Sequence, residues 1–323
     1  MRVLVTGAGG FIGSHLVEAC VEAGHHVRAF VHYNSKNSWG WLDECPCKRD
    51  VEVVAGDVRD YDSVHRALQN CDTVFHLAAL IGIPYSYVSP LAYVRTNIEG
   101  TYNVLEAARV NGVSRICVTS TSETYGTAQY VPIDENHPVV GQSPYSATKI
   151  GADQLAVSYY RSFGLPVTIV RPFNTYGPRQ SARAIIPSIV IQILNGQAPI
   201  RVGNLSPLRD FTYVRDTANA FLEINNSEVL RGEVVNIGTN KQISMRHLAE
   251  LIMGIIGEHR ELEVTDERTR PPASEVDSLV CDNSKLLRAT NWRPTHRLEQ
   301  GIGETIHWIR CNMHVFKSGI YNV

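Results

Sequence analysis

The stretch RVLVTGAGGFIGSHLVEACVEAG, residues 2–24, carries the clearest indication of the fold. Arg2–Thr6 is an apolar run typical of a short buried strand, GAGGFIG is a glycine-rich turn, and an amphipathic helical segment follows. Such glycines let the backbone approach a pyrophosphate at a helix N-terminus, where unpaired N–H groups favour negative charge. The spacing is GxxGxxG, and Ile12 stands where the standard GxGxxG pattern has its last glycine. The stretch predicts a dinucleotide site that includes Gly7, Gly10, Phe11, Ile12 and Gly13.

The composition is that of an ordinary globular protein. With 323 residues, 44% of them hydrophobic and 19% charged, the chain can bury a large core as one large domain or two smaller ones. A formal net charge of −2 and the absence of long Lys/Arg runs argue against nucleic acid as a partner. No apolar run reaches membrane-spanning length and a strand begins at once, so we expect no signal peptide, no membrane partner and a cytoplasmic location.

The seven cysteines are an odd number spread over the whole chain, which fits reduced thiols better than a disulfide framework. Cys45 and Cys47 form a CPC pair in a polar segment, but no second Cys or His pair stands nearby at zinc-site spacing. We therefore expect no metal site, and an exposed loop around the CPC pair.

The second strand, His26–Val31, is expected to end at the adenosine ribose of the cofactor. NAD-binding folds commonly place a carboxylate there, whereas this strand runs out into His32, Asn34, Ser35 and Lys36. The pattern permits NADP without requiring it, since Asn34 or Ser35 can also serve a bare ribose. The choice between NAD and NADP therefore stays open.

The next two strands supply further cofactor candidates. Val51–Ala55 leads to Asp57, which either contacts the adenine amino group or caps the helix that begins near Asp60. Thr73–Leu77 leads to Ala78 and Ala79, whose small side chains would let the cofactor lie against the backbone. Because strands and helices keep alternating, the pattern predicts a parallel, doubly wound α/β sheet.

Four polar residues follow the strand predicted over Arg115–Thr119. They are Ser120, Thr121, Ser122 and Glu123, and they fall just past its C-terminal end, where open α/β sheets bind ligands. Tyr145 and Lys149 stand four residues apart at the head of a helix that runs to about Phe163, so they share one helix face. A lysine ammonium there is expected to lower the tyrosine pKa from about 10, which would make Tyr145 a base.

After Val170 the regular alternation of strands and helices ends. We expect helices over Ile185–Leu194 and Met245–Ile256, another from near Asp216 and a last one from about Leu298 to Arg310, while Val234–Ile237 returns to the main sheet. The predicted fold is Rossmann-like. Residues 1–172 and 209–243 would bind the dinucleotide, residues 173–208 and 244–311 would form a smaller interwoven substrate domain, and residues 312–323 would be a tail.

Together these motifs resemble the extended short-chain dehydrogenases/reductases, specifically the nucleotide-sugar epimerase/dehydratase family. The resemblance runs from Arg2 to about Arg310 and includes YSATK at Tyr145, RPFNTYGPRQ from Arg171 and RDFTYV from Arg209. The segments VHYNSKNSWGWLD, HLAALIGIPYSY and RPFNTYGPRQSARAIIP are most similar to the 4,6-dehydratases that act on nucleotide-linked N-acetylglucosamine in legionaminic acid-type pathways. The resemblance implies a tightly bound NAD(P), a nucleotide-sugar substrate and a homodimer held by a four-helix bundle of residues 100–110 and 145–163.

The resemblance also implies roles for single residues. Tyr145 takes the proton from the sugar 4-hydroxyl while hydride leaves C4, Lys149 holds the cofactor ribose, and Ser120 or Thr121 orients the sugar oxygen. Glu123 removes the C5 proton, and the 6-hydroxyl leaves as water. Ser122 replaces the aspartic acid of the dTDP-glucose 4,6-dehydratases, so the proton donor is left open between Glu123 and a water.

Further contacts are implied at both ends of the site. For the cofactor they are Val58, Leu77 and Asn97, and for the substrate Pro84, Asn174, Arg179, Arg209, Arg270 and Glu275. Arginine fits a diphosphate because its planar fork pairs phosphate oxygens bidentately. For Arg270 and Glu275 the other interpretation is an ion pair in a solvated loop. Trp39 and Trp41 are expected to pack rather than to bind sugar.

Two other classes of function stay open. A 4-epimerase or a UDP-glucuronate-type decarboxylase would share the first step. Epimerases of this superfamily carry an uncharged residue at the position of Glu123, and decarboxylases are expected to have acidic and basic residues where this chain has Ser146-Ala147-Thr148. A catalytically silent dinucleotide-binding protein is the third possibility, but it would have no use for Tyr145 and Lys149 together with a base.

Overall fold

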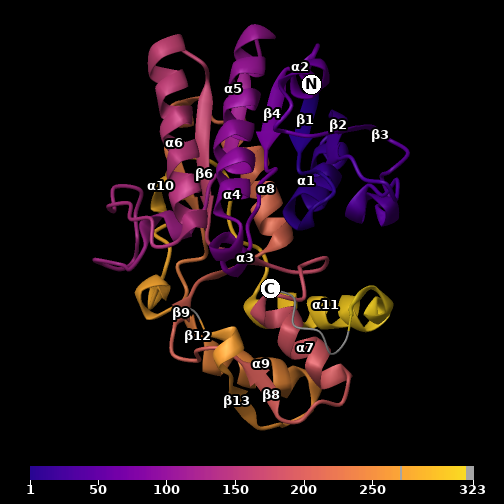
Figure 1. Cartoon of the computed structure of the whole chain (residues 1–323), viewed down its shortest axis with the longest axis vertical. Coiled ribbons are helices and arrows are strands. Elements are labelled where there is room, and N and C mark those ends of the chain that lie inside the picture. The colour runs from indigo at the N-terminus through magenta and orange to yellow at the C-terminus, as the bar shows by residue number, and fades with distance from the viewer. Residues whose placement is uncertain (270, 318–323) are drawn as a thin grey trace.

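One parallel sheet of seven strands forms the centre of the protein in a computed structural model that describes residues 1–269 and 271–317 (Figure 1). Its order is β11-β6-β5-β4-β1-β2-β3, and every neighbouring pair is parallel. The strands are β1 (Arg2–Thr6), β2 (His26–His32), β3 (Val51–Gly56), β4 (Thr73–His76), β5 (Arg115–Thr119), β6 (Val167–Pro172) and β11 (Val234–Ile237). The expected doubly wound α/β fold is confirmed.

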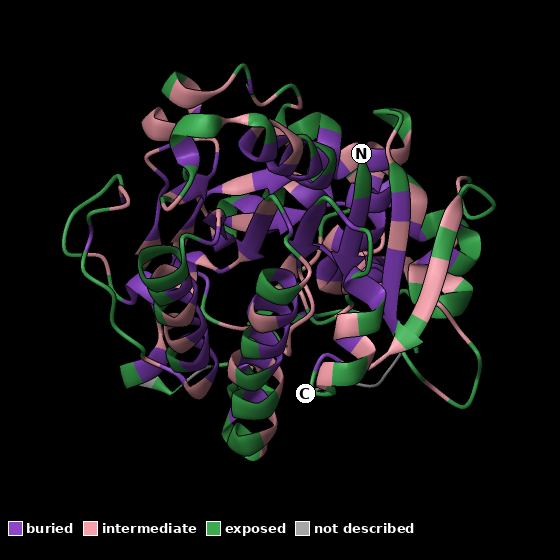
Figure 2. Ribbon diagram, turned by 90° about the horizontal axis from the view of Figure 1, so that it is seen from above, coloured by how far each residue is buried: buried purple, intermediate pink, exposed green. Residues whose placement is uncertain are grey.

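Helices cover both faces of the sheet because successive side chains of each strand point to opposite sides. Val3 and Val5 of β1 belong to the core on one face, and Leu4 belongs to the core on the other. The first face is covered by α1 (Phe11–Glu22), α8 (Val214–Asn226) and α10 (Ser284–Ala289), the second by α2 (Tyr61–Leu68), α5 (Gly100–Val110) and α6 (Pro144–Phe163). From above, the mostly buried central strands lie between helices with exposed outer faces, and the edge strand β3 is intermediate to exposed (Figure 2).

A smaller group of elements lies below the carboxyl ends of the strands (Figure 1). Helices α7 (Ile185–Leu194), α9 (Met245–Ile256) and α11 (Leu298–Cys311) share an apolar core with strand β8 (Ile200–Val202). The remaining strands are β7 (Asn174–Tyr176) beside β10 (Phe211–Tyr213), β13 (Leu262–Val264) beside β8, and β9 (Leu208–Arg209) between β12 (Ile243–Ser244) and β14 (Ser278–Leu279). The division into a dinucleotide domain and a substrate domain stays a prediction.

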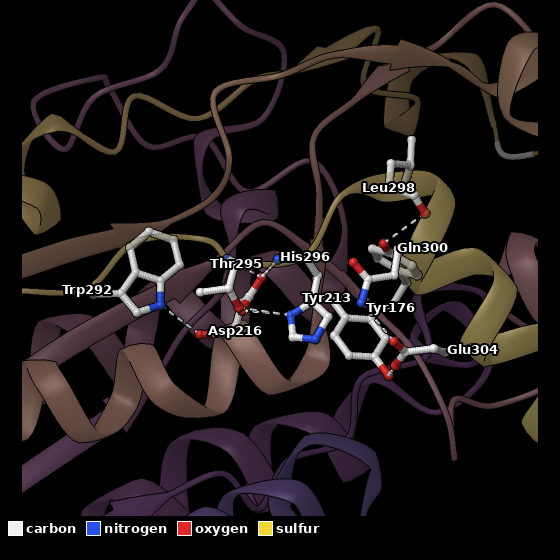
Figure 3. Close-up of polar contacts among 9 residues, drawn as sticks. All are labelled: Tyr176, Tyr213, Asp216, Trp292, Thr295, His296, Leu298, Gln300 and Glu304. Atoms are coloured by element: carbon white, nitrogen blue, oxygen red, sulfur yellow. Dashed lines mark hydrogen bonds and ion pairs between the residues drawn. The ribbon is translucent and has the colours of Figure 1, made fainter.

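Asp216 in the first turn of α8 binds the segment that precedes α11 (Figure 3). Its carboxylate is buried and accepts from the backbone N–H and hydroxyl of Thr295 at 3.1 and 2.7 Å. It also accepts from the backbone N–H of His296 at 3.0 Å, and the His296 ring Nδ1 lies 3.0 Å away. Tyr213 donates to Glu304 of α11 at 2.6 Å. These bonds hold the C-terminal helix and the segment before it against β10 and the start of α8.

The connection between β4 and β5 contains helical turns that the sequence pattern does not indicate. They are α3 (Ile83–Val88), α4 (Pro90–Tyr93) and a π-helical turn over Val94–Glu99, which runs directly into α5. Pro84 and Pro90 lie in first turns, where proline is tolerated because its missing N–H has no partner in the helix. Short 3-10 turns lie at Gly40–Glu44, Ser122–Tyr125, Glu228–Leu230, Asp266–Arg268, Pro272–Ser274 and Met313–Val315.

The expectation of an exposed loop around the CPC pair is only partly right, because Pro46 and residues 48–50 are exposed whereas Cys45 is buried. Cys45 is only 2% exposed and belongs to the core beneath α1, because the turn after Gly40–Glu44 folds back onto that helix. Its thiol donates to Glu18 of α1 at 3.4 Å. In residues 1–269 and 271–317, no three His, Cys, Asp or Glu side chains are placed to hold a metal ion. None of the helices described in those ranges is long and apolar enough to cross a membrane.

Candidate active site

A cleft of about 1350 Å³ opens at the carboxyl ends of the strands, between the sheet and the smaller group of elements. Open parallel sheets bind ligands at this edge. Most of the predicted site residues line it: Gly7, Gly10, Phe11, Ile12, Gly13, His32, Asn34, Ser35, Lys36, Asp57, Val58, Leu77, Ala78, Ala79, Pro84, Ser120, Thr121, Glu123, Tyr145, Lys149, Asn174, Arg209 and Glu275.

The glycine-rich turn places backbone, without side chains, at the start of α1. Gly7 has φ +70°, and a Cβ added there would lie 2.8 Å from the backbone nitrogen of Ala78. A Cβ on Gly13 would lie 2.2 Å from the carbonyl oxygen of Gly7. Gly10 is the N-cap of α1 and has no side chain to bond the first N–H groups of the helix. This arrangement fits the pyrophosphate of a dinucleotide.

The far end of the cleft is shaped by the loop after β2. The Asn34 amide donates to the carbonyls of His32 and Ser38 at 3.2 and 2.8 Å, and its oxygen accepts from the Lys36 N–H at 3.1 Å, so this side chain orders its own loop. Ser35 and Lys36 line the cleft beside it. A ribose there would meet hydroxyl, amide and ammonium groups of this loop.

Asp57 is not the cap of α2, which settles one alternative. Asp60 caps that helix, because its carboxylate accepts from the N–H groups of Asp62 and Ser63. Asp57 accepts instead from the Arg59 guanidinium at 3.0 Å, and this bond lowers the pKa of Asp57. Asp57 is thus an ionised acceptor at the cleft wall.

Tyr145 and Lys149 lie on one face of α6, as expected, and both are buried at the inner end of the cleft. The helix begins just before Tyr145 because Ser143 and Ser146 form a capping box and Pro144 occupies the first turn. The Lys149 ammonium donates to the carbonyl of Thr119 at 2.6 Å. Burial raises the pKa of Tyr145 and lowers the pKa of Lys149 to about 8. The expected lowering of the tyrosine pKa is therefore wrong: burial has the largest effect, the charges of Glu123 and Asp153 raise the pKa further, and only the bond with Thr121 lowers it.

Thr121 and Glu123 face Tyr145 from the turn that follows β5. The Thr121 hydroxyl accepts from the Glu123 N–H at 3.2 Å, and its bond to Tyr145 acts against the effect of burial by pulling the tyrosine pKa down. The negative charge of Glu123 is close enough to push the same pKa up. The cleft thus brings a hydroxyl, a phenol and a carboxylate together at one place.

Ser122 and Asn97 do not line the cleft, which corrects two predictions. Ser122 is buried, because in the turn after β5 its two neighbours take the positions that face the cleft. The Asn97 amide is used within the protein: its oxygen accepts from the Leu80 N–H at 2.9 Å and its nitrogen donates to Thr148 at 3.0 Å. Asn97 therefore fixes the loop after β4 against α6 instead of meeting the cofactor.

Arg209 and Glu275 form an ion pair at the opposite end of the cleft from α1. The Arg209 Nη2 and a Glu275 carboxylate oxygen are 3.5 Å apart, and both side chains are largely buried. The pair is thus part of the cleft wall rather than of a solvated loop. Asn174 lines the same end from β7, and Pro84 lies at the start of α3. Arg270 lies outside the described residues.

Arg179 does not reach the cleft, so its predicted substrate contact is wrong. Its guanidinium donates to Glu18 at 2.6 Å and to the Ser14 hydroxyl at 3.2 Å, both on α1. Burial by itself would raise the pKa of Glu18, but the bonds from His15 and Arg179 lower it to about 2. The Arg179 backbone has a φ of +70°, and its side chain lies against α1.

Two charged residues near the site have no counterpart among the predictions. Arg183 lines the cleft from the loop before α7, and its only described hydrogen bonds go to the Ser181 hydroxyl. Asp153 lies behind the cleft and accepts from the Ser120 hydroxyl at 2.8 Å. Asp153 stands four residues after Lys149, so the helical spacing already places it on the same face.

A parallel sheet with a glycine-rich turn at the first helix, and a Tyr–Lys pair in the same cleft, define a dinucleotide-dependent enzyme of the short-chain dehydrogenase/reductase type. The chain belongs to the GDP-mannose 4,6 dehydratase family, whose model matches residues 4–305, within the wider NAD-dependent epimerase/dehydratase group. It is thus an enzyme of the nucleotide-sugar dehydratase, epimerase and decarboxylase superfamily.

Individual relatives cover nearly the whole chain but differ in reaction. A putative UDP-glucose 4-epimerase of Methanocaldococcus jannaschii is 32% identical over 96% of this chain and 99% of its own length. A UDP-N-acetyl-alpha-D-glucosaminuronate decarboxylase of Bacillus cytotoxicus is 31% identical over 96% and 98%. The crystal structure of DesIV, a dTDP-glucose 4,6-dehydratase of Streptomyces venezuelae with NAD bound, matches with a TM-score of 0.90 at 27% identity over 98% and 99%.

Proposed function

We propose that the protein is an NAD(P)-dependent nucleotide-sugar 4,6-dehydratase. Its substrate would be UDP- or GDP-N-acetylglucosamine, and its product the 4-keto-6-deoxy derivative. The observation that carries the proposal is the position of Glu123 in the cleft, where its charge acts on Tyr145. A carboxylate there can remove a proton next to a new carbonyl, whereas a simple epimerase has no need of such a base.

The cofactor would lie with its pyrophosphate on the N-terminus of α1 and its adenosine towards Ser35, Lys36 and Asp57. Ala78 and Ala79 leave room along its length, and Lys149 would hold the second ribose. When bound, the nicotinamide would accept hydride from sugar C4 and, after water has left across C5 and C6, return it to C6, while C5 takes up a proton that comes from solvent. The side chains around the nicotinamide therefore need to supply only proton transfers.

Tyr145 would remove the proton from the sugar 4-hydroxyl as C4 is oxidised. Thr121 assists, because its hydroxyl bonds Tyr145 and stabilises the phenolate. The resulting 4-ketone makes the C5 hydrogen acidic, and Glu123 would take it. The proton for the leaving 6-hydroxyl would come from Glu123 or from a water, since Ser122 is buried and does not line the cleft.

A substrate panel tests the proposal. We expect one of UDP- and GDP-N-acetylglucosamine to lose one water and gain a 4-keto group, with deuterium from heavy water entering at C5. Mass spectrometry separates the outcomes, because epimerisation conserves mass and decarboxylation removes carbon dioxide. A protein that retains cofactor and converts none of the nucleotide sugars would contradict the proposal and support a silent binding protein.

Decarboxylation is the second candidate, and Arg183 is the observation that favours it. This cation faces the cleft near Gly82 and Tyr93, where a sugar carboxylate could pair with its fork. A 4-epimerase is the other relative of the same fold. UDP-N-acetylglucosaminuronate in the same panel decides between them: release of carbon dioxide from it, and no water loss from the neutral sugars, would overturn the dehydratase assignment.

We also propose a homodimer through a four-helix bundle of α5 and α6 with their copies. The two helices pack side by side and leave Tyr102, Val110, Tyr160 and Phe163 exposed. A cytoplasmic location and a place among the legionaminic acid-type dehydratases are likewise proposals that come from the sequence.

A further inference from the structure

Asp153 lies behind the Tyr145–Lys149 pair on α6. It follows Lys149 by one helical turn and Tyr145 by two, so the three side chains share one face. Asp153 is 1% exposed, and its Oδ2 accepts from the Ser120 hydroxyl at 2.8 Å and from Nη2 and Nε of Arg171 at 2.9 and 3.2 Å. Its Oδ1 is buried and accepts no hydrogen bond from the residues that the structure describes.

Arg171 is itself held in place, so Asp153 has a fixed partner. The Arg171 guanidinium carbon lies 4.8 Å from the centre of the Tyr125 ring, and the Tyr125 hydroxyl donates to Asn236 at 2.7 Å. The Ser120 N–H donates to the carbonyl of Val170 at 2.6 Å. One carboxylate thus joins the ends of β5 and β6 to the helix of the Tyr–Lys pair.

This arrangement has two consequences for the cleft. The Ser120 hydroxyl gives its proton to Asp153, so towards a sugar it offers only lone pairs and acts as an acceptor. Lys149 is fully buried, and the Asp153 charge opposes the lowering of its pKa by burial. His76 also feels the lysine charge, which together with burial lowers the pKa of His76 to about 3. Tyr145 stands one turn before Lys149 on the same helix, and the charges of Asp153 and Glu123 both raise its pKa.

We infer that Asp153 is a positioning residue for the proposed reaction: it turns Ser120 into an acceptor towards the sugar and keeps Lys149 an ammonium beside Tyr145. The inference rests on the proposed function only for the sugar contact. The effect on Lys149 concerns any dinucleotide bound in this cleft, because Lys149 would hold the cofactor ribose whatever the sugar chemistry.

The test is the pH dependence of Asp153→Asn. Lys149 works as an ammonium, so cofactor affinity and kcat/KM should fall as pH rises through its pKa. Loss of the neighbouring anion lowers that pKa. We therefore expect the alkaline limb, the fall in affinity and in kcat/KM at high pH, to shift to lower pH by about one unit. Fluorescence titration of NAD(H) measures the affinity profile without turnover, so the inference is tested even if no sugar is converted.

Asp210→Asn is the matched control. Asp210 is as buried as Asp153 and accepts from Thr239 and Asn240, but it belongs to the loops beside β9. Its variant should unfold at a lower temperature with the alkaline limb at the wild-type pH. Ser120→Ala should lower kcat and leave the limb in place, because it removes only the hydroxyl.

A second variant covers the case in which Asp153→Asn does not fold. Asp153→Asn with Arg171→Gln removes both charges of the buried ion pair together, which avoids leaving one buried charge without its partner. We expect the same downward shift of the limb. An unmoved limb in the variant that folds would overturn the inference and leave Asp153 as a partner of Arg171 only.

Discussion

Single residues decide which reaction this cleft can perform. Thr121, Glu123 and Tyr145 meet at its inner end, and their proposed roles are to orient the sugar oxygen, to remove the C5 proton and to remove the 4-hydroxyl proton, in that order. The raised pKa of Tyr145 means that the phenolate forms only where other groups stabilise it. The Thr121 hydroxyl does so through its bond with Tyr145, and the Lys149 ammonium lies one helical turn away on the same face.

Glu123→Gln should stop water elimination and leave oxidation at C4 possible. We expect a fall in dehydratase kcat of about 10²–10⁴-fold, the usual worth of a general base. Single-turnover absorbance of the reduced nicotinamide should still rise and then persist, because the 4-keto sugar cannot go forward. Ser122→Ala is the neighbouring control and should keep nearly full activity, since Ser122 is buried outside the cleft. Elimination at the wild-type rate by Glu123→Gln would remove Glu123 as the base.

At the scale of elements, the cofactor end depends on how closely α1 approaches β1 and β4. Gly7 and Gly13 make this approach possible, because a side chain at either position would meet backbone atoms that cannot move aside. The N-terminus of α1 is thereby held open towards the cleft.

Gly13→Ala should weaken cofactor binding at least tenfold and lower the thermal midpoint. The added Cβ would lie 2.2 Å from the Gly7 carbonyl, so the turn has to shift. Gly303→Ala is the control within helix α11, where, apart from the helix's own backbone, no atom of residues 1–269 and 271–317 lies within 4 Å of the added carbon. It should be neutral or stabilise the fold by about 0.5–1 kcal/mol, because glycine is a poor helix former. Calorimetry and cofactor titration measure both effects, and equal behaviour of the two variants would contradict this account of the turn.

The elements themselves follow from local patterns, which is why the sequence predicts them well. Each central strand is an apolar run, and helices such as Ile185–Leu194 and Met245–Ile256 begin and end where the periodicity predicts. Side-chain directions depend on packing and are predicted less well. Arg179 turns to Glu18, Ser122 turns inward, and Asn97 binds the neighbouring loop, and none of these choices is visible in the local sequence.

On the scale of the whole molecule, the exposed apolar side chains of α5 and α6 are the surface on which the proposed dimer depends. Tyr102, Val110, Tyr160 and Phe163 lie on two adjacent helices of one face. Burial of such residues contributes about 25 cal/mol for each Å² of apolar surface removed from water. A second copy of the same two helices would supply a matching surface.

Tyr102→Lys combined with Val110→Lys should convert the protein to a monomer. Two buried ammonium groups on each side of the bundle would cost more than the interface gains. Light scattering at several concentrations measures the mass. Val264→Lys is the control, because Val264 is equally exposed on the distant strand β13 and should keep the dimer. A wild-type protein that is monomeric at working concentration would refute the bundle.

The hydrogen bonds around Asp216 determine which truncated forms of this protein can fold. The groups that satisfy this buried carboxylate belong to Thr295 and His296, 79 and 80 positions later in the chain. An expression fragment that stops before them would lose these hydrogen bonds and also Trp292, whose buried ring packs in the core beneath the sheet, so apolar surface beside α8 would be exposed to water. Attempts to isolate the sheet as a minimal unit should therefore yield aggregated material unless the distant C-terminal segment is included.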